Sequence, residues 1–172
     1  NLKQHHDTFK SWDKLGFLST IAQNTDNNSI ILDAGSGTKA VIASALVKLG
    51  FNNINACDLQ PELRGLSQRE KSAIDYKVAD LRSLPYDDCH FDFVASMSVI
   101  EHVGDIESVV AELSRITKYN GYVQISTDYW ENKIDCQGIY PYGKNQPEMK
   151  IFSKDEMIHF IKIFEKYGLK LK

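Results

Sequence analysis

The sequence predicts an α/β fold in which a doubly wound, mainly parallel sheet lies between two layers of helices. Short apolar runs rich in β-branched residues alternate with helical patterns between residues 30 and 128, which is the order of strands joined by helical crossovers. Residues 30–46, IILDAGSGTKAVIASAL, pass from a strand through a glycine loop into a helix. Asp33, Asp58 and Asp80 each follow an apolar run. We expect the strand order 3-2-1-4-5, with one more edge strand from the C-terminus.

The elements follow from the spacing of apolar residues. Five apolar side chains at helical spacing predict an amphipathic helix over residues 8–23, and these are Phe9, Trp12, Leu15, Leu18 and Ile21. Strands are predicted at residues 30–33, 53–58, 73–80, 91–97 and 122–128. Helices are predicted at residues 39–49, from Pro61 to about residue 71, at 105–118 and at 154–167.

Local signals mark the last elements. Asn120 and Gly121 predict a turn before the fifth strand. Ser153, with Glu156 three residues later, has the spacing of a capping box and predicts the start of the last helix. Residues 169–172, LKLK, predict the beginning of the further edge strand.

Length and pattern predict a single domain over residues 1–172. Residues 1–29 form its N-terminal helix and loop. Residues 129–150 form a long connection with little pattern, and loops of that length in a compact domain are usually functional or disordered.

Composition excludes several classes of protein. The formal net charge is −3 and there is no long basic run, so neither nucleic acid nor an anionic membrane is the expected partner. The three cysteines include no C-x-x-C pair, which argues against a disulfide framework and against a zinc site, so no metal is expected. They favour a reducing, cytoplasmic location. No apolar run approaches the roughly 20 residues that cross a bilayer.

The candidate site lies where the predicted strands end. In an open α/β sheet, ligands bind beyond the carboxyl ends of the strands, so Asp33, Asp58 and Asp80 are expected to converge on one crevice beside the glycine loop. Glycines permit a close approach of the backbone, and carboxylates accept hydrogen bonds from hydroxyl or amino groups. The alternative is that these acids only cap helices or form turns.

An ordered set of motifs, LDAGSGT, CD, VADLRSLPYDDCHFDFVASMSVIEHV and ELSRITKYNGYVQIST, resembles the class I S-adenosylmethionine-dependent methyltransferases, particularly the type 11 family. The resemblance covers about residues 30–128 and implies a Rossmann-like, three-layer αβα fold with S-adenosyl-L-methionine as cofactor. It places Asp58 at the ribose, Asp80 at the adenine amino group, and Met97 near the sulfonium. The cofactor-binding residues that it implies are Asp33, Gly35, Ser36, Gly37, Asp58, Leu59, Asp80, Leu81 and Met97.

The sequence departs from the family pattern at two places. Lys39 stands where a third glycine is usual, and it can point away, pair with the cofactor's carboxylate or crowd the pocket. The family's C-terminal antiparallel hairpin is represented by its first strand at most, so we expect a truncated hairpin. An open sheet edge of that kind is a pairing liability that a homodimer would cover.

The expected reaction is in-line methyl transfer to a small-molecule acceptor, with His102 as the base that removes the acceptor's proton. His102 has the alternative role of bracing the next loop. Tyr129, Trp130, Tyr140 and Tyr142 are candidates for stacking on the acceptor or for a small satellite core. Two other classes stay open. Gly35, Gly37 and Ala40 also fit the fingerprint of an NAD(P)-dependent oxidoreductase, and a catalytically silent methyltransferase-like module is the third.

Overall fold

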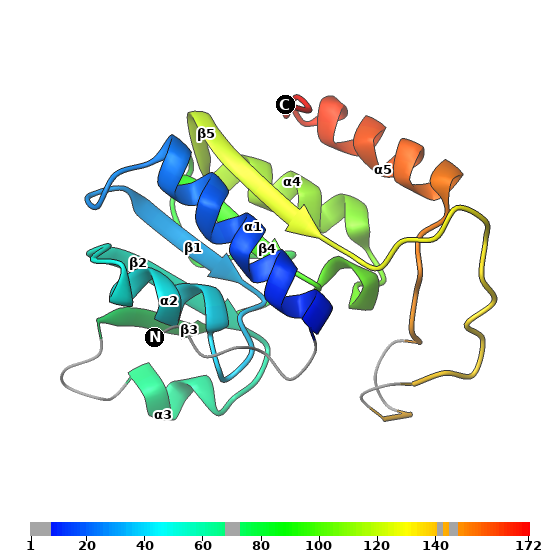
Figure 1. The fold of residues 1–172 in the computed structure, drawn as a ribbon, viewed down its shortest axis with the longest axis horizontal. Helices are drawn as coiled ribbons and strands as arrows, with labels where there is room; N and C mark the ends of the chain where they lie inside the picture. The colour runs from blue at the N-terminus through cyan, green and yellow to red at the C-terminus, as the bar shows by residue number, and fades with distance from the viewer. Residues whose placement is uncertain (1–7, 68–72, 141–142, 145–147) are drawn as a thin grey trace.

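A five-stranded parallel sheet forms the centre of the protein in the computed structural model, which describes residues 8–67, 73–140, 143–144 and 148–172 (Figure 1). Its order is β3-β2-β1-β4-β5, which confirms the predicted fold class and strand order. The strands are β1 (Ile30–Ala34), β2 (Asn53–Asp58), β3 (Ile74–Val78), β4 (Phe91–Met97) and β5 (Thr117–Ser126). The helices are α1 (Thr8–Asn24), α2 (Val41–Lys48), α3 (Leu63–Ser67), the 3-10 helix η1 (Ile100–His102), α4 (Ile106–Ile116) and α5 (Lys154–Lys166).

Helices cover both faces of the sheet, α1 and α2 one face and α4 and α5 the other (Figure 1). Neighbouring residues of β1 therefore enter different cores. Ile31 packs in the cluster with α1 and α2, and Leu32 packs in the cluster with α4 and α5. Burial on both faces explains why the central strands are continuous apolar runs.

The chain changes direction across the sheet between β1 and β4. The helix after β1 lies on one face and the helix after β4 lies on the other, so the loops that follow these two strands separate at their carboxyl ends. This topological switch point is where open α/β sheets bind ligands. The fold thus puts the glycine loop at the predicted place.

Strand β5 differs from its prediction. It begins at Thr117 and not at residue 122, and the predicted turn at Asn120 and Gly121 lies inside it. Asn120 has φ +64°, and the pairing with β4 shifts register between Phe91 and Phe93. The turn residues therefore form an irregularity of the strand, because β4 offers partners on both sides of it.

The buried face of α1 also differs from its prediction. Trp12 and Leu15 are 70% and 52% exposed, whereas Lys14 and Phe17 are buried. Leu18 and Ile21 are buried as predicted, and the side chain of Phe9 lies outside the described residues. The helix carries two apolar stripes, and only the position of the sheet decides which one is covered.

The prediction of a C-terminal edge strand is wrong, because residues 169–172 form no strand. Gly168, at φ +83°, ends α5, and the amide of Leu169 donates to the carbonyl of Phe164 at 3.0 Å. Lys172 Nζ then donates to the hydroxyl of Tyr122 at 2.9 Å. The segment makes its hydrogen bonds to α5 and to side chains, and it does not pair with β5 as a strand.

The predicted capping box of the last helix is confirmed at Ser153 and Glu156. The helix predicted from Pro61 is described only as far as Ser67, and residues 68–72 lie outside the described part. Within the described residues, each helix is too short or too polar to traverse a bilayer.

Candidate cofactor and acceptor site

The glycine loop is fixed to the end of β2 by backbone hydrogen bonds. The carbonyl of Cys57 accepts from the amides of Gly35 and Ser36 at 2.9 and 3.0 Å. The next amide, that of Gly37, donates to Asp58 Oδ2 at 2.8 Å. The structure therefore brings the loop and the predicted ribose-binding acid into direct contact.

Gly35 and Gly37 serve different purposes, although both have positive φ, +76° and +57°. A Cβ at Gly35 would lie 2.5 Å from Cγ2 of Val99, so this glycine lets the segment after β4 lie against the loop. A Cβ at Gly37 would meet nothing within 4 Å, so Gly37 faces open space. The first glycine permits the close contact with Val99, and the second leaves open space beside the loop.

Asp33 turns its carboxylate toward the start of α2. The side chain is 3% exposed, and Oδ2 accepts from the amide of Ala43 at 3.0 Å. The N-cap of α2, Ala40, has left-handed dihedral angles and provides no side-chain cap, so Asp33 caps the helix from the neighbouring strand. Burial raises the pKa of Asp33 to about 6, against the hydrogen bonds from Ala43 and Ile42 that lower it.

This contact bears on the kind of ligand. A dinucleotide's pyrophosphate binds the free amides at the N-terminus of the first helix. Here Asp33 already holds an amide of that first turn, so this amide is not free for a pyrophosphate. Asp58 adds a second acid beside the loop. The site accordingly favours a ligand with cationic groups over a diphosphate.

Asp58 is half-buried, and its Oδ1 accepts from the amide of Gln60 at 3.1 Å. Its backbone carbonyl accepts from Ala79 at 3.0 Å, which links the end of β2 to the segment that holds Asp80. The neighbouring Leu59 side chain is 67% exposed, at the rim of this region.

Asp80 has a partner that the sequence reading missed. Nε and Nη2 of Arg82 donate to its carboxylate, with Nη2 2.6 Å from Oδ2, and the Arg82 amide donates to Oδ1 at 2.9 Å. These hydrogen bonds from Arg82 lower the pKa of Asp80. The Asp-x-Arg spacing was the available signal. Leu81, between them, is buried in the core on the α4 side.

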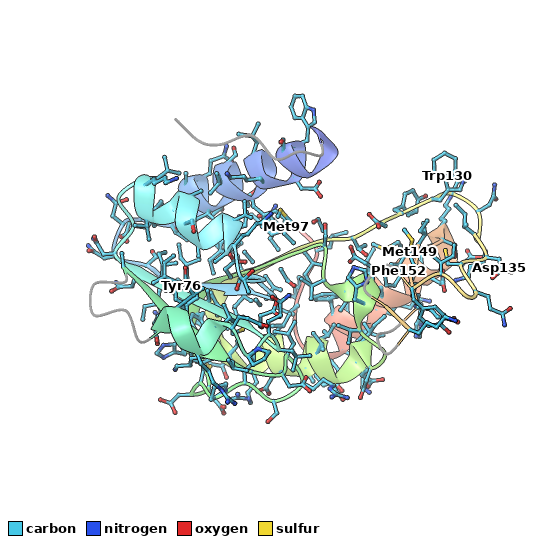
Figure 2. The ribbon with its side chains drawn as sticks, turned by 90° about the horizontal axis from the view of Figure 1, so that it is seen from below. Tyr76, Met97, Trp130, Asp135, Met149 and Phe152 are labelled. Atoms are coloured by element: carbon cyan, nitrogen blue, oxygen red, sulfur yellow. The ribbon has the colours of Figure 1, made fainter. Side chains whose placement is uncertain are left out.

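The end of β4 and the segment after it hold the remaining predicted residues. Met97 is partly buried against the α1 and α2 cluster (Figure 2), and Ser98 has φ +55°. His102 ends η1, its amide donates to the carbonyl of Val99 at 2.9 Å, and its Nδ1 is buried.

Glu101 is a second residue that the sequence reading did not single out. Its side chain is 2% exposed, and Oε2 accepts from Thr127 Oγ1 at 3.1 Å. Because Thr127 directly follows β5, this bond ties η1 to the start of the long connection. The candidate base therefore stands on a braced helical turn.

The long connection projects to one side of the body, where Figure 2 labels Trp130, Asp135, Met149 and Phe152. Tyr129 and Trp130 are 49% and 60% exposed just beyond β5. The hydroxyl of Tyr140 donates to Glu148 at 2.9 Å farther out. Tyr142 lies outside the described residues.

A parallel sheet with its switch point beside an acid-lined glycine loop defines the Rossmann-like class of S-adenosylmethionine-dependent methyltransferases. The chain belongs to the type 11 methyltransferase domain family, whose model, described as a methyltransferase domain, matches residues 32–125. This confirms the resemblance seen in the motifs.

Curated relatives are O-methyltransferases. Malonyl-[acyl-carrier protein] O-methyltransferase of Serratia marcescens is 29% identical over 97 residues, which are 56% of this chain and 37% of the relative. Ubiquinone biosynthesis O-methyltransferase of Pelagibacter ubique is 33% identical over 103 residues, 58% of this chain and 42% of the relative. The chain thus spans about two fifths of the length of these relatives.

Solved structures share the fold. Phosphoethanolamine N-methyltransferase 2 of Haemonchus contortus, in complex with S-adenosyl-L-methionine, has a TM-score of 0.70 at 19% identity, over 91% of this chain and 36% of that one. A putative sarcosine dimethylglycine methyltransferase from Galdieria sulphuraria has a TM-score of 0.69 at 18% identity, over 96% and 65%.

Proposed function

We propose that the protein transfers a methyl group from S-adenosylmethionine to a hydroxyl oxygen of a small, uncharged or cationic molecule. The observation that carries this proposal is the contact between the Gly37 amide and Asp58 Oδ2, 2.8 Å long, at the switch point of the sheet. This hydrogen bond joins the loop after β1 to the acid at the end of β2, so that both would contact one ligand at the same edge of the sheet.

The donor set fits the cofactor. S-adenosylmethionine supplies an activated methyl group on a sulfonium, and it carries an ammonium group and two ribose hydroxyls. Asp58 would accept from the ribose, and the open space at Gly37 would admit the methionine portion. The carboxylate of Asp80 is already paired with Arg82. A hydrogen bond from the adenine amino group would therefore go to a carboxylate lone pair that Arg82 does not occupy.

The chain's own contribution to the reaction is position and proton transfer. His102 would accept the proton of the acceptor hydroxyl, and because Nδ1 is buried we assign this role to Nε2. Tyr129 and Trp130, exposed beside the end of β5, would contact the acceptor and exclude water. Alignment of the hydroxyl with the methyl group supplies most of the acceleration.

The acidic residues near the site and the names of the curated relatives support the proposed class of methyl acceptor. Asp58 lies beside the glycine loop, and Asp128 follows β5, so an anionic acceptor would be repelled. Both curated relatives quoted above are O-methyltransferases by name, which favours oxygen as the methylated atom. A cytoplasmic location and a homodimer stay predictions.

The test is calorimetric titration with S-adenosylmethionine, S-adenosylhomocysteine and NAD in parallel. We expect the first two to bind, and Asp58→Ala to weaken them about 10- to 100-fold, the size of a charge-assisted hydrogen bond. Asp75→Asn is the matched control, because Asp75 lies near the amino end of β3. Binding of NAD alone would establish the oxidoreductase instead. Cofactor binding with no methylation of any phenol, catechol or aliphatic alcohol would indicate the silent module.

A further inference from the structure

The long connection has a closed neck, where its two limbs meet. The amide of Trp130 donates to the carbonyl of Phe152 and the amide of Phe152 donates to the carbonyl of Asp128, both at 2.9 Å. These bonds make an isolated parallel bridge between Tyr129 and Phe152. Phe152 is 1% exposed and stacks on Phe160 of α5 at 5.8 Å between ring centroids, so the returning limb is anchored in the core.

One carboxylate of α5 contacts both limbs, and Lys154 of the same helix also contacts the outgoing limb, with its Nζ 3.8 Å from Oε1 of Glu131. Oε1 of Glu156 lies 2.8 Å from Nζ of Lys133, on the outgoing limb, and 3.8 Å from Nζ of Lys150, on the returning limb. Oε2 accepts from the amide and the hydroxyl of Ser153 at 2.9 and 3.1 Å, which completes the capping box. Each oxygen thus has its own task, Oε2 in starting the helix and Oε1 in joining the limbs.

The charge of Glu156 is maintained by these partners. Burial alone would raise its pKa, but the hydrogen bonds from Lys133 and Ser153 outweigh burial and lower the pKa to about 2. The carboxylate is therefore ionised at neutral pH. The two lysines accordingly face a negative charge at the neck.

We propose that Glu156 is a positioning residue for the methyl acceptor. By holding Lys133 and Lys150 it keeps the neck closed, and the closed neck presents Tyr129 and Trp130 beside the carboxyl end of β5. This inference rests on the proposed function for the identity of the ligand, but the joining of the two limbs is independent of it.

One variant separates the two tasks of Glu156. Glu156→Gln keeps an amide oxygen that accepts from Ser153, since Gln serves in a capping box as well as Glu. It removes the charge that attracts the two lysines. Asp155→Asn is the matched control, because Asp155 lies in the same first turn of α5 and makes no ion pair with Lys133 or Lys150.

Hydrogen exchange of the full chain gives the first readout. In Glu156→Gln we expect the amides of Trp130 and Phe152 to exchange about fivefold faster, in line with the loss of two partly exposed ion pairs. Amides of β1 and β4 should not change, and Asp155→Asn should match the wild type. A Lys133→Met, Lys150→Met double variant should reproduce the effect. Equal exchange in Glu156→Gln and the wild type would overturn the inference.

Kinetics with catechol as the probe acceptor give the second readout, because its neutral ring and hydroxyls match the proposed acceptor. We expect Glu156→Gln to raise the KM for catechol about fivefold, with kcat and cofactor affinity within about twofold of the wild type. A fall in kcat with unchanged KM would overturn the positioning role. If the wild type binds the cofactor but does not methylate catechol, the acceptor class fails, and a faster-exchanging neck in Glu156→Gln still supports the joining role.

Discussion

The cofactor crevice and the long connection, which face the same end of the sheet, are held by different forces. In the crevice, backbone amides of Gly35, Ser36 and Gly37 bond to the end of β2, and Asp33 is buried. In the connection, side-chain contacts such as those of Glu148 and Glu156 add to a few backbone hydrogen bonds, such as the one from the Met149 amide to the carbonyl of Ile139. Substitutions that change the shape of a side chain should therefore affect the crevice most. Substitutions that change charge should affect the connection most.

The largest effect should come from Gly35→Ala. Its Cβ would lie 2.5 Å from Val99 at φ +76°, so strain and overpacking together should destabilise the protein by about 2–5 kcal/mol. Gly37→Ala has positive φ but open space, and should cost only about 1–2 kcal/mol. Urea unfolding of both variants measures the difference. Val99→Ala should recover part of the loss in Gly35→Ala, and equal losses at the two glycines would refute the packing argument.

Asp33→Asn should separate stability from binding. The folded pKa of about 6 exceeds the ordinary 3.8, so the folded state holds the proton more tightly, and stability is lost as pH rises from about 4 to 6. A shift of this size corresponds to about 3 kcal/mol. The Asn variant should be about 2 kcal/mol more stable than the wild type at pH 7.5 and equal to it at pH 4.

Unfolding curves across that pH range, with cofactor titration of the same samples, measure both quantities. We expect the variant to bind S-adenosylmethionine more weakly while it is more stable, because the charge that costs stability also interacts with Asp58, which holds the glycine loop. Parallel stability profiles for the wild type and Asp33→Asn would contradict this account.

Lys39→Gly tests the departure from the family pattern at the crevice. The Lys39 side chain is exposed, and no ion pair involves it within the described part of the chain. We expect the glycine variant to bind S-adenosylmethionine about threefold more weakly at low salt, because the ammonium group favours the cofactor's carboxylate. The difference should vanish in 0.5 M salt, roughly where the Debye length falls below 5 Å. Tighter binding by the variant would show that Lys39 crowds the pocket.

Tyr140→Phe should have the smallest effect. The hydroxyl bonds to Glu148 in the outer part of the connection, where solvent screens the contact. We expect an unchanged midpoint of urea unfolding and faster exchange only at the Met149 amide, which donates to Ile139 at 2.8 Å. A lower midpoint would mean that the connection contributes to the global fold and would weaken the contrast between the two regions.

The sequence alone determined the features that depend on local chemistry and on the alternation of apolar runs. The strand order, the glycine loop at the end of β1 and the capping box at Ser153 were all predicted correctly. Patterns of this kind are sufficient because burial on two faces, positive φ and helix capping each leave a mark within a few residues.

Only the tertiary structure decided which surfaces meet. It chose Phe17 over Trp12 as the buried side of α1, since both stripes have helical spacing. It turned Asp33 toward α2, because that helix begins without a cap of its own. It also brought Lys133 and Lys150 to Glu156, a pairing across the closed neck that no local spacing encodes. Contacts between segments far apart in the chain depend on the packed sheet, and the sequence pattern specifies the sheet but not these contacts.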